Sequence, residues 1–322
     1  MIYDLVGKRA WFFVVSAIIL IPGLISLALP GGLHPGIDFV SGSIMTLQFE
    51  QPVEQSALRQ AFADLGHSEA IVQRAGDGTY IVRTTTLQAE SRDAVGNVLS
   101  GSERQRVQDQ LGGRFGPLTV PTFDQVSPIV AAEIVRNSVI AVLVACLGIL
   151  LYLWWAFRHV AESWRYGVCA VVALIHDALA VLGIFSILGR LFAIELDALF
   201  ITAVLTVIGF SVHDTIVVFD RIRENSIRHA GESFEDIVNH SLMQTLGRSL
   251  TTSLTVLLTL FTLWLFGGVT IRNFVLALLI GITSGTYSSI FNASMLLVVW
   301  ETKKFGTLFG KATGRVPAAS GA

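Results

Sequence analysis

The sequence predicts an all-α membrane bundle of six helices, with a small α+β domain inserted between the first helix and the second. Three observations support this prediction. Hydrophobic residues make up 52% of the 322-residue chain and charged residues only 14%, compared with about 25% charged residues in a typical soluble domain. Six apolar runs have roughly the ~20-residue length that spans a bilayer. One polar stretch of ordinary composition separates the first run from the second.

The apolar runs divide the chain into ten segments. The first run is longer than the ~7–15-residue apolar core of a secretory signal peptide, so we expect an uncleaved helix that is bent or weakened at Pro22 and Gly23. The expected order is a cytoplasmic N-terminus (1–10), a transmembrane helix (11–29), a periplasmic domain (30–132), three transmembrane helices (133–157, 164–188, 196–219), a cytoplasmic amphipathic helix or loop (220–247), two transmembrane helices (248–266, 273–300) and a cytoplasmic tail (301–322).

The polar stretch has the alternation of strands and helices that is typical of a small α+β domain. Four strands are predicted over 43–50, 70–74, 79–84 and 118–123, with a hairpin at Gly76, Asp77 and Gly78. Two helices are predicted over 54–65 and 102–111, the second ending at Gly112 and Gly113. The order β-α-β-β-α-β is that of a ferredoxin-like domain.

The distribution of Lys and Arg predicts the orientation in the membrane, because these residues are enriched in cytoplasmic loops. We expect both termini in the cytoplasm and the polar domain outside it. The outer short loops then receive only Arg190 and Arg272. The cytoplasmic side receives the remaining flanking cations, which are Lys8, Arg9, Arg158, Arg165, Arg221, Arg223, Arg228, Arg248, Lys303, Lys304, Lys311 and Arg315. The connection over 217–248 has an amphipathic pattern that predicts a helix lying on the membrane surface.

One stretch of the fourth run carries ionisable residues. Asp214 follows His213 within an apolar sequence, and a carboxylate at the bilayer centre costs roughly 2.5 kcal/mol or more. Arg248 opens the fifth run, which is antiparallel to the fourth, so we expect the Asp214 and Arg248 side chains to pair at the same depth. A proton relay and a structural salt bridge both fit this pair. Arg248 alone also fits an anchor that reaches the membrane surface, and His213 a hydrogen-bonded core histidine.

Further polar residues lie along the other helices. Thr252, Thr255, Thr259 and Thr262 follow the helical period, so they form a stripe that faces other helices or water rather than lipid. In the sixth run the small residues Gly281, Gly285, Ser288 and Asn292 allow close helix packing. Asp177 in the third run fits either a hydrogen-bonding contact between helices or a secondary proton site.

Several classes of function are not expected. The sequence has no Gly-rich phosphate loop, no Gly-x-Ser-x-Gly elbow, and no Cys-x-x-Cys or His-x-x-x-His spacing. We therefore expect neither an enzyme nor a bound cofactor or metal. The net charge of −2 without a basic cluster gives no indication of nucleic-acid binding. An intramembrane carboxylate near an arginine is instead typical of proton relays in transporters.

Long motifs in the expected helices resemble the SecF branch of the SecD/SecF protein-export family, within the resistance-nodulation-division (RND) superfamily. The first motif is Gly36-Ile37-Asp38-Phe39 with Gly42, where Ser41-Gly42-Ser43 departs slightly from the family's Gly-Gly pair. The others lie over 211–225, 244–253, 267–281 and 285–291. The resemblance covers residues 5 to about 305.

The resemblance implies a half of an RND-type transporter that acts with SecD in the bacterial inner membrane. It implies use of the proton motive force, with sodium as the alternative ion, to assist late, ATP-independent preprotein export through SecYEG, in an assembly that includes YajC and YidC. Proton conduction would involve Asp214 and Arg248 with His213 and Thr252, while Asp177 and Thr255 are secondary candidates. Gly36, Asp38, Phe39 and Gly42 would form a hinge, although a plain turn fits these residues equally.

Two other functions are compatible with the sequence. One is an exporter of lipids or drugs that acts as a dimer, although the polar domain of about 100 residues is small for that class. The other is a non-catalytic assembly factor, in which the intramembrane polar residues only hold helices together. Copurification without a SecD-like partner, together with small-molecule efflux, would favour the exporter. Proton flux in reconstituted vesicles distinguishes the assembly factor from the proton-driven subunit.

Overall fold

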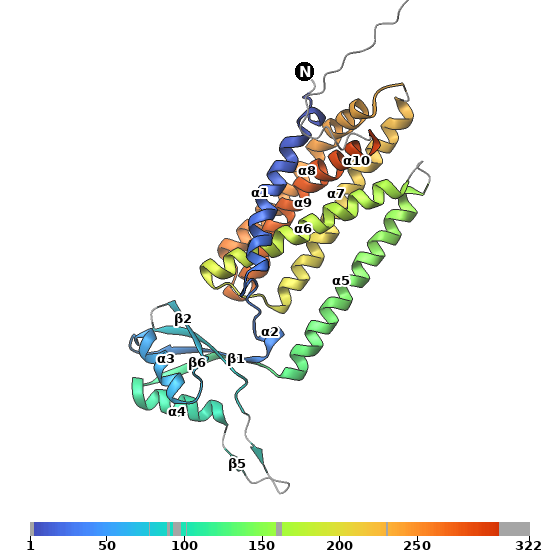
Figure 1. Ribbon diagram of the computed structural model, residues 1–322. Helices are drawn as coiled ribbons and strands as arrows, with labels where there is room; N and C mark the ends of the chain where they lie inside the picture. Colours follow the sequence, from blue (N-terminus) through green and yellow to red (C-terminus); the bar gives the residue numbers. More distant parts are fainter. Residues whose placement is uncertain are drawn as a thin grey trace, which may run out of the picture. The chain divides into compact units, whose positions relative to one another are not determined.

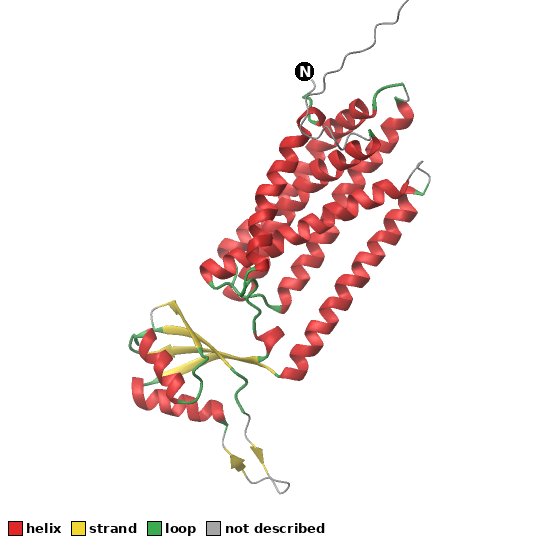
Figure 2. Cartoon of the chain, viewed as in Figure 1, coloured by secondary structure: helices red, strands yellow, loops and turns green. Residues whose placement is uncertain are grey.

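The computed structural model describes residues 3–76, 78–88, 91–92, 98–100, 102–158, 163–229 and 231–302 (Figures 1 and 2). The chain folds into two compact units. A membrane unit contains Met1–His34 and Ala141–Ala322, and a small unit contains Pro35–Ile140. The division between the two units falls within helix α5 (Pro128–Phe157).

Six helical segments are long and apolar enough to cross a membrane. They are α1 (Arg9–Ala28, preceded by η1, Val6–Lys8), α5 (Pro128–Phe157), α6 (Ser163–Phe192), α7 (Ala198–Arg228), α8 (Phe234–Phe266) and a last segment made of α9 (Arg272–Tyr287), η3 (Ser288–Asn292) and α10 (Ala293–Glu301). The short helix η2 (Val269–Ile271) precedes α9. The six expected membrane helices are thus present.

The connection between the fourth and fifth helices differs from the expectation of a separate surface helix. Helix α7 continues to Arg228, and α8 begins at Phe234 and passes through Arg248 without a break. The Ser233 side chain caps α8 by accepting a hydrogen bond from the Asp236 backbone N–H. The predicted apolar stripe is buried within the protein, since Val238 and Leu242 are fully inaccessible. Protein packing therefore takes the place of the expected membrane surface.

Glycine allows close contact between helices of the membrane unit. Helix α1 continues across Pro22, and its next residue, Gly23, lies against Gly183 of α6. A Cβ atom added to Gly23 would lie 2.8 Å from the Gly183 Cα atom. On α9, a Cβ atom at Gly281 would lie 2.2 Å from the Val207 side chain of α7. Small residues thus set the helix spacing, as the sequence indicated.

The small unit contains a four-stranded antiparallel sheet (Figure 2). Its strands are β1 (Gly42–Phe49), β2 (Ile71–Gly76), β3 (Thr79–Thr84) and β6 (Leu118–Val126), in the order β2-β3-β1-β6. Its helices are α2 (Ile37–Val40), α3 (Gln55–Asp64) and α4 (Glu103–Phe115). Buried Leu47, Leu58, Phe62, Tyr80 and Leu111 belong to one core. This strand order is that of the expected ferredoxin-like domain.

Local details of the small unit differ from the sequence-based prediction. Helix α4 runs through Gly112 and Gly113 and is followed by Gly116, whose φ of 94° is a conformation that glycine adopts without strain. A separate pair of short strands, β4 (Ser91–Arg92) and β5 (Val98–Ser100), was not predicted. Asp77 of the expected hairpin lies outside the described residues, while the adjacent Gly78 has a φ of 71°.

Candidate functional site

Asp214 is a buried carboxylate on α7. The residue is 3% exposed, and its Oδ2 atom is buried without a hydrogen-bond partner among the described residues. Buried polar atoms in proteins are nearly always paired. His213 precedes Asp214 in the sequence, and Arg248 is on the adjacent helix α8. The Asp214 carboxylate therefore has a free acceptor position on a helix that packs against α8.

Arg248 lies on the adjacent helix α8 without contacting Asp214 directly. Within the described ranges, no hydrogen bond or ion pair joins the two side chains, so the expected direct pair is not formed in this structure. Arg248 is exposed, and it lines a pocket of about 400 Å³ between α7 and α8. The pocket is otherwise lined by Val217, Asp220, Arg221, Glu224, Gln244 and Thr245.

The remaining candidates on α7 and α8 lie on the surface of the membrane unit. His213, Thr252 and Thr255 are exposed. The two threonine hydroxyls donate to carbonyls of their own helix, with Thr252 Oγ1 2.9 Å from the Arg248 oxygen and Thr255 Oγ1 2.8 Å from the Thr252 oxygen. Thr259 and Thr262 continue this exposed stripe. Within the part of the chain that the structure describes, the stripe is therefore not covered by another helix.

Asp177 is the second buried carboxylate, and its surroundings are the opposite of those of Asp214. It is fully inaccessible. Its Oδ2 atom accepts hydrogen bonds of 2.6 Å from both Ser211 on α7 and Ser288 in η3. Its Oδ1 atom accepts one of 3.1 Å from Ser284 on α9 and lies 3.1 Å from the His176 Nδ1 atom. Asp177 therefore connects α6 to α7 and to the α9–η3 segment.

The serines around Asp177 are the residues that sequence reasoning missed. The sequence indicated Ser288 only as a small packing residue and gave no prediction for Ser211, Ser284 or Ser289. Ser289 extends the cluster, because its hydroxyl donates to the Ser211 carbonyl oxygen at 2.9 Å. The signal was the spacing of Ser284 and Ser288, four residues apart on one helix face. Serine is common in close-packed membrane helices, so this spacing alone did not indicate a carboxylate partner.

The four hinge candidates lie at the start of the small unit. Gly36 precedes the single helical turn of α2, which contains Asp38 and Phe39, and the Phe39 N–H donates to the Gly36 oxygen. Ser41 then has a φ of 66° and a ψ of 164°. Gly42 has a φ of 141°, and a Cβ atom there would lie 2.7 Å from the Thr84 oxygen. The segment is an ordered turn whose backbone requires glycine at Gly42 and favours it at Ser41.

Comparisons with known proteins show which family the sequence matches. The family model described as "Protein export membrane protein SecD/SecF, C-terminal" matches residues 107–303, and "SecD/SecF GG Motif" matches residues 31–53. The chain is similar to the protein translocase subunit SecF of Thermobaculum terrenum, with 52% identity over 95% of this chain and 96% of that protein. SecF of Anaerolinea thermophila is 42% identical over 98% and 99% of the two chains.

Two solved structures of SecDF also match this chain. A crystal structure of a Thermus SecDF, described as a translocon-associated membrane protein, matches with a TM-score of 0.78 and 32% identity. The match covers 94% of this chain but 39% of that one. A SecDF in a super-membrane-facing form matches with a TM-score of 0.65. The chain thus spans about two fifths of the fused SecDF proteins.

Proposed function

Because this chain belongs to the SecF branch of the SecD/SecF protein-export family, we propose that it acts with a SecD subunit to assist preprotein export with energy from the proton motive force. The chain is a multi-pass membrane protein of the Sec translocase family. In the matched SecDF the corresponding region is 39% of a longer chain. A separate SecD subunit would supply the remainder here.

The observation that carries this proposal is the buried Oδ2 atom of Asp214, which has no hydrogen-bond partner among the residues that the structure describes. A carboxylate that changes protonation needs an oxygen free to receive the proton, and intramembrane carboxylates mark proton relays. Asp177 lacks such an oxygen because hydroxyl donors and His176 contact both of its oxygens. We therefore assign proton transfer to Asp214 and a structural role to Asp177.

Arg248 and the pocket beside it fit a role in controlling access to Asp214. Arg248 places a permanent positive charge on the helix adjacent to Asp214 and leaves the Asp214 Oδ2 atom without a hydrogen bond. The polar pocket that Arg248 lines also contains Asp220 and Glu224, six and ten positions further along α7. This pocket is the proposed proton route between Asp214 and the cytoplasm, with both chain termini on the same cytoplasmic side.

The exposed stripe formed by Thr252, Thr255, Thr259 and Thr262, together with His213, is the proposed contact with SecD. Small and hydroxyl-bearing residues are enriched at interfaces between membrane helices. A SecD helix against this face would remove His213 from lipid and place a second carboxylate near Asp214. SecYEG, with YajC and YidC, and unfolded preproteins would be the other partners of the complex in the bacterial inner membrane.

Preprotein export into inverted inner-membrane vesicles tests the proposal. We expect Asp214→Asn to remove the stimulation of export by the proton motive force while membrane insertion and co-purification with SecD are retained. Glu232→Gln is the matched control, because Glu232 is an exposed carboxylate within the loop between α7 and α8. Normal stimulation in the Asp214→Asn complex would contradict the proposal and favour an assembly factor.

A further inference from the structure

Ser249 on α8 is a buried serine whose hydroxyl has no hydrogen-bond partner among the described residues. The residue is 2% exposed. A hydroxyl inside a helix can donate to the carbonyl oxygen four residues earlier, as Thr245 does to Ser241 at 2.9 Å. Every other serine and threonine hydroxyl of α8 takes part in a hydrogen bond. Within the described part of the chain, Ser249 is therefore the one hydroxyl of this helix that remains available.

Neighbouring residues of α9 contact both α7 and α8 at one level of the bundle. A Cβ atom added to Gly285 would lie 3.2 Å from the Ser211 Cβ atom of α7. The next residue, Thr286, donates from its Oγ1 atom to the Ser253 Oγ atom of α8 at 2.7 Å. Ser211 on α7 and Ser253 on α8 therefore lie at about the same level.

Asp214 and Ser249 both lie about one helical turn from this level, in the same direction. Helix α7 runs toward the loop that joins it to α8, and α8 runs away from that loop. Asp214 follows Ser211 by three residues, and Ser249 precedes Ser253 by four residues. Because a turn contains 3.6 residues, both residues are displaced by about one turn toward the loop.

A hydrogen bond between α7 and α8 gives the same register. The Asn225 Nδ2 atom of α7 donates to the Ser241 Oγ atom of α8 at 2.9 Å. Three turns contain about 11 residues. Counted from this bond away from the loop, three turns lead to Asp214 on α7 and to residue 252 on α8. Ser249 is within one turn of residue 252, so it lies near the level of Asp214.

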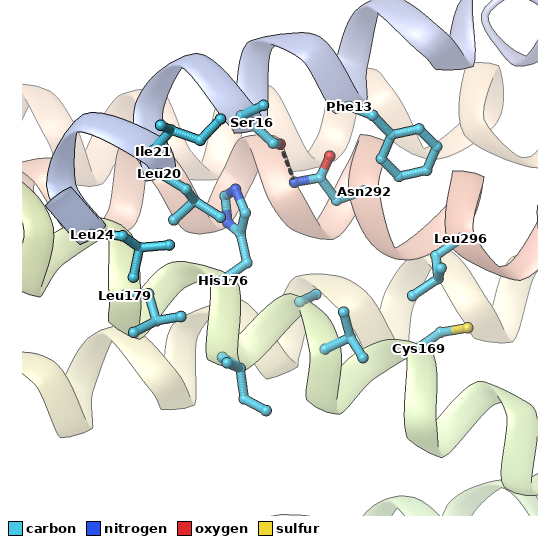
Figure 3. Close-up of a pocket in the computed structure, with 14 residues that line it drawn as sticks. Phe13, Ser16, Leu20, Ile21, Leu24, Cys169, His176, Leu179, Asn292 and Leu296 are labelled. Atoms are coloured by element: carbon cyan, nitrogen blue, oxygen red, sulfur yellow. Dashed lines mark hydrogen bonds between the residues drawn. The ribbon is translucent and has the colours of Figure 1, made fainter. Parts of the chain in front are cut away.

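Other buried acceptor atoms without a partner among the described residues lie elsewhere in the membrane unit. Asn292 Oδ1 and His176 Nε2 belong to residues that line a cavity of about 460 Å³ between α1, α6 and the η3–α10 segment. There Asn292 donates to Ser16 of α1 at 2.7 Å (Figure 3). Ser294 lies eight residues beyond Thr286, about two turns further along the last segment. Among these atoms, Ser249 Oγ fits the level of Asp214 best.

The chemistry of Asp214 requires such an acceptor. When the Asp214 Oδ2 atom receives a proton it becomes a donor, and a buried donor without an acceptor costs about 1–3 kcal/mol. Arg248 cannot serve, because a guanidinium has donors only, whereas a serine hydroxyl can accept. We propose that Ser249 accepts the hydrogen bond of the protonated Asp214 carboxyl group. The proton stays on Asp214 and Ser249 keeps its own, so Ser249 is a positioning residue. This inference rests on the proposed function.

Proton flux into proteoliposomes that contain the complex with SecD tests this role. We expect Ser249→Ala to reduce the flux about two- to tenfold, which is the change that one net hydrogen bond gives. Ser249→Thr, which keeps the hydroxyl, should restore it. Ser253→Ala is the matched control, since Ser253 is also 2% exposed and its hydroxyl binds Thr286. This control should lower the thermal denaturation midpoint but leave the flux unchanged.

Infrared difference spectroscopy between two pH values separates this role from packing. The C=O stretching band of protonated Asp214 is the band that is missing in Asp214→Asn. Ser249→Ala should shift this band, and Ser253→Ala should leave it in place. Unchanged flux in Ser249→Ala, or an equal loss of flux in both alanine variants with the band in place, would overturn the inference. Flux that persists in Asp214→Asn would instead overturn the proposed function, and this inference with it.

Discussion

Asp177 accepts a 2.6 Å hydrogen bond from Ser211, which lies only three residues before Asp214 on the same helix. Asp177 therefore contacts the same turn of α7 that carries Asp214, but the hydrogen-bonding surroundings of the two buried carboxylates differ. The oxygens of Asp177 are occupied by donors, whereas Asp214 Oδ2 has none within the described part of the chain. This difference in hydrogen bonding supports the separate roles proposed for the two residues.

The Asp177 cluster is expected to stabilise the membrane unit. A hydrogen bond to a charged group contributes about 1.5–3 kcal/mol, so Ser211→Ala should lower the thermal denaturation midpoint of the purified protein by several degrees. Thr259→Ala is the matched control, since the Thr259 hydroxyl is exposed and bonds only to its own helix. An equal effect of both substitutions would argue against a structural role for the cluster.

Arg190 is expected to hold the end of α1. Its Nη2 atom donates to the carbonyl oxygens of Ser26, Leu29 and Pro30 at 2.9–3.0 Å. Since the last carbonyls of a helix lack intrahelical partners, Arg190→Ala should increase amide hydrogen exchange over residues 26–34. Arg272→Ala removes a comparable cation that lies over Trp264. Arg272→Ala should leave amide hydrogen exchange at the end of α1 unchanged. Unchanged protection of residues 26–34 in Arg190→Ala would contradict the proposed role of Arg190.

Ser41→Gly is expected to stabilise the small unit. The φ and ψ angles of Ser41, 66° and 164°, lie in a region that only glycine adopts without a strain of about 1–3 kcal/mol. Part of the gain is offset by the greater freedom of glycine in the unfolded chain, so we expect a net stabilisation of about 0.5–1 kcal/mol.

Hydrogen exchange of β1 measures this effect, and Ser43→Gly provides a comparison of opposite sign. Ser43 is buried, and its Oγ atom accepts a 3.1 Å hydrogen bond from the Leu87 N–H. Ser43→Gly should therefore reduce protection of β1, while Ser41→Gly increases it. A loss of protection in Ser41→Gly would show that the strain is not present.

The stability of the small unit should fall at acidic pH in part through Glu69. Burial tends to raise the pKa of this carboxyl, but hydrogen bonds from its own backbone, Thr84 and Thr85 outweigh that effect and lower the pKa from 4.5 to about 2. A folded-state pKa below the unfolded value stabilises the fold above pH 4.5, and this contribution is lost as the pH falls from 4.5 toward 2. The effect is limited because the side chain is 44% exposed.

Denaturation of the full chain at a series of pH values measures this contribution. Glu69→Gln should flatten the pH dependence of unfolding of the small unit between pH 4.5 and pH 2. Glu50→Gln, which changes another exposed glutamate of the same unit, serves as the control. If the two variants had the same pH dependence, Glu69 would not carry the effect.

The fold class could be predicted from the sequence because apolar length and strand alternation are strong local signals. The end of α4 could not, because three glycines follow one another closely and the chain enters a positive φ only at Gly116. The region over 217–248 was also ambiguous, since an amphipathic stripe has the same pattern whether it packs on lipid or on another helix. Burial of Val238 and Leu242 decides between them.

The candidate site, too, could be predicted from the sequence only in part. Asp214 stands out in the sequence because a carboxylate in an apolar run is rare. The serines around Asp177 do not, since their contact depends on how three helices come together. The distance between Asp214 and Arg248 likewise depends on side-chain conformations that helix register does not determine.

Proton flux into proteoliposomes that contain the complex with SecD tests the central assignment most directly. A pH-sensitive dye reports the flux after a pH difference is imposed, and Glu232→Gln serves as the control for both variants. We expect Asp214→Asn to abolish the flux carried by the complex, and Asp177→Asn, in the fraction of protein that remains folded, to retain it. Flux that persists in Asp214→Asn but disappears in folded Asp177→Asn would contradict the account.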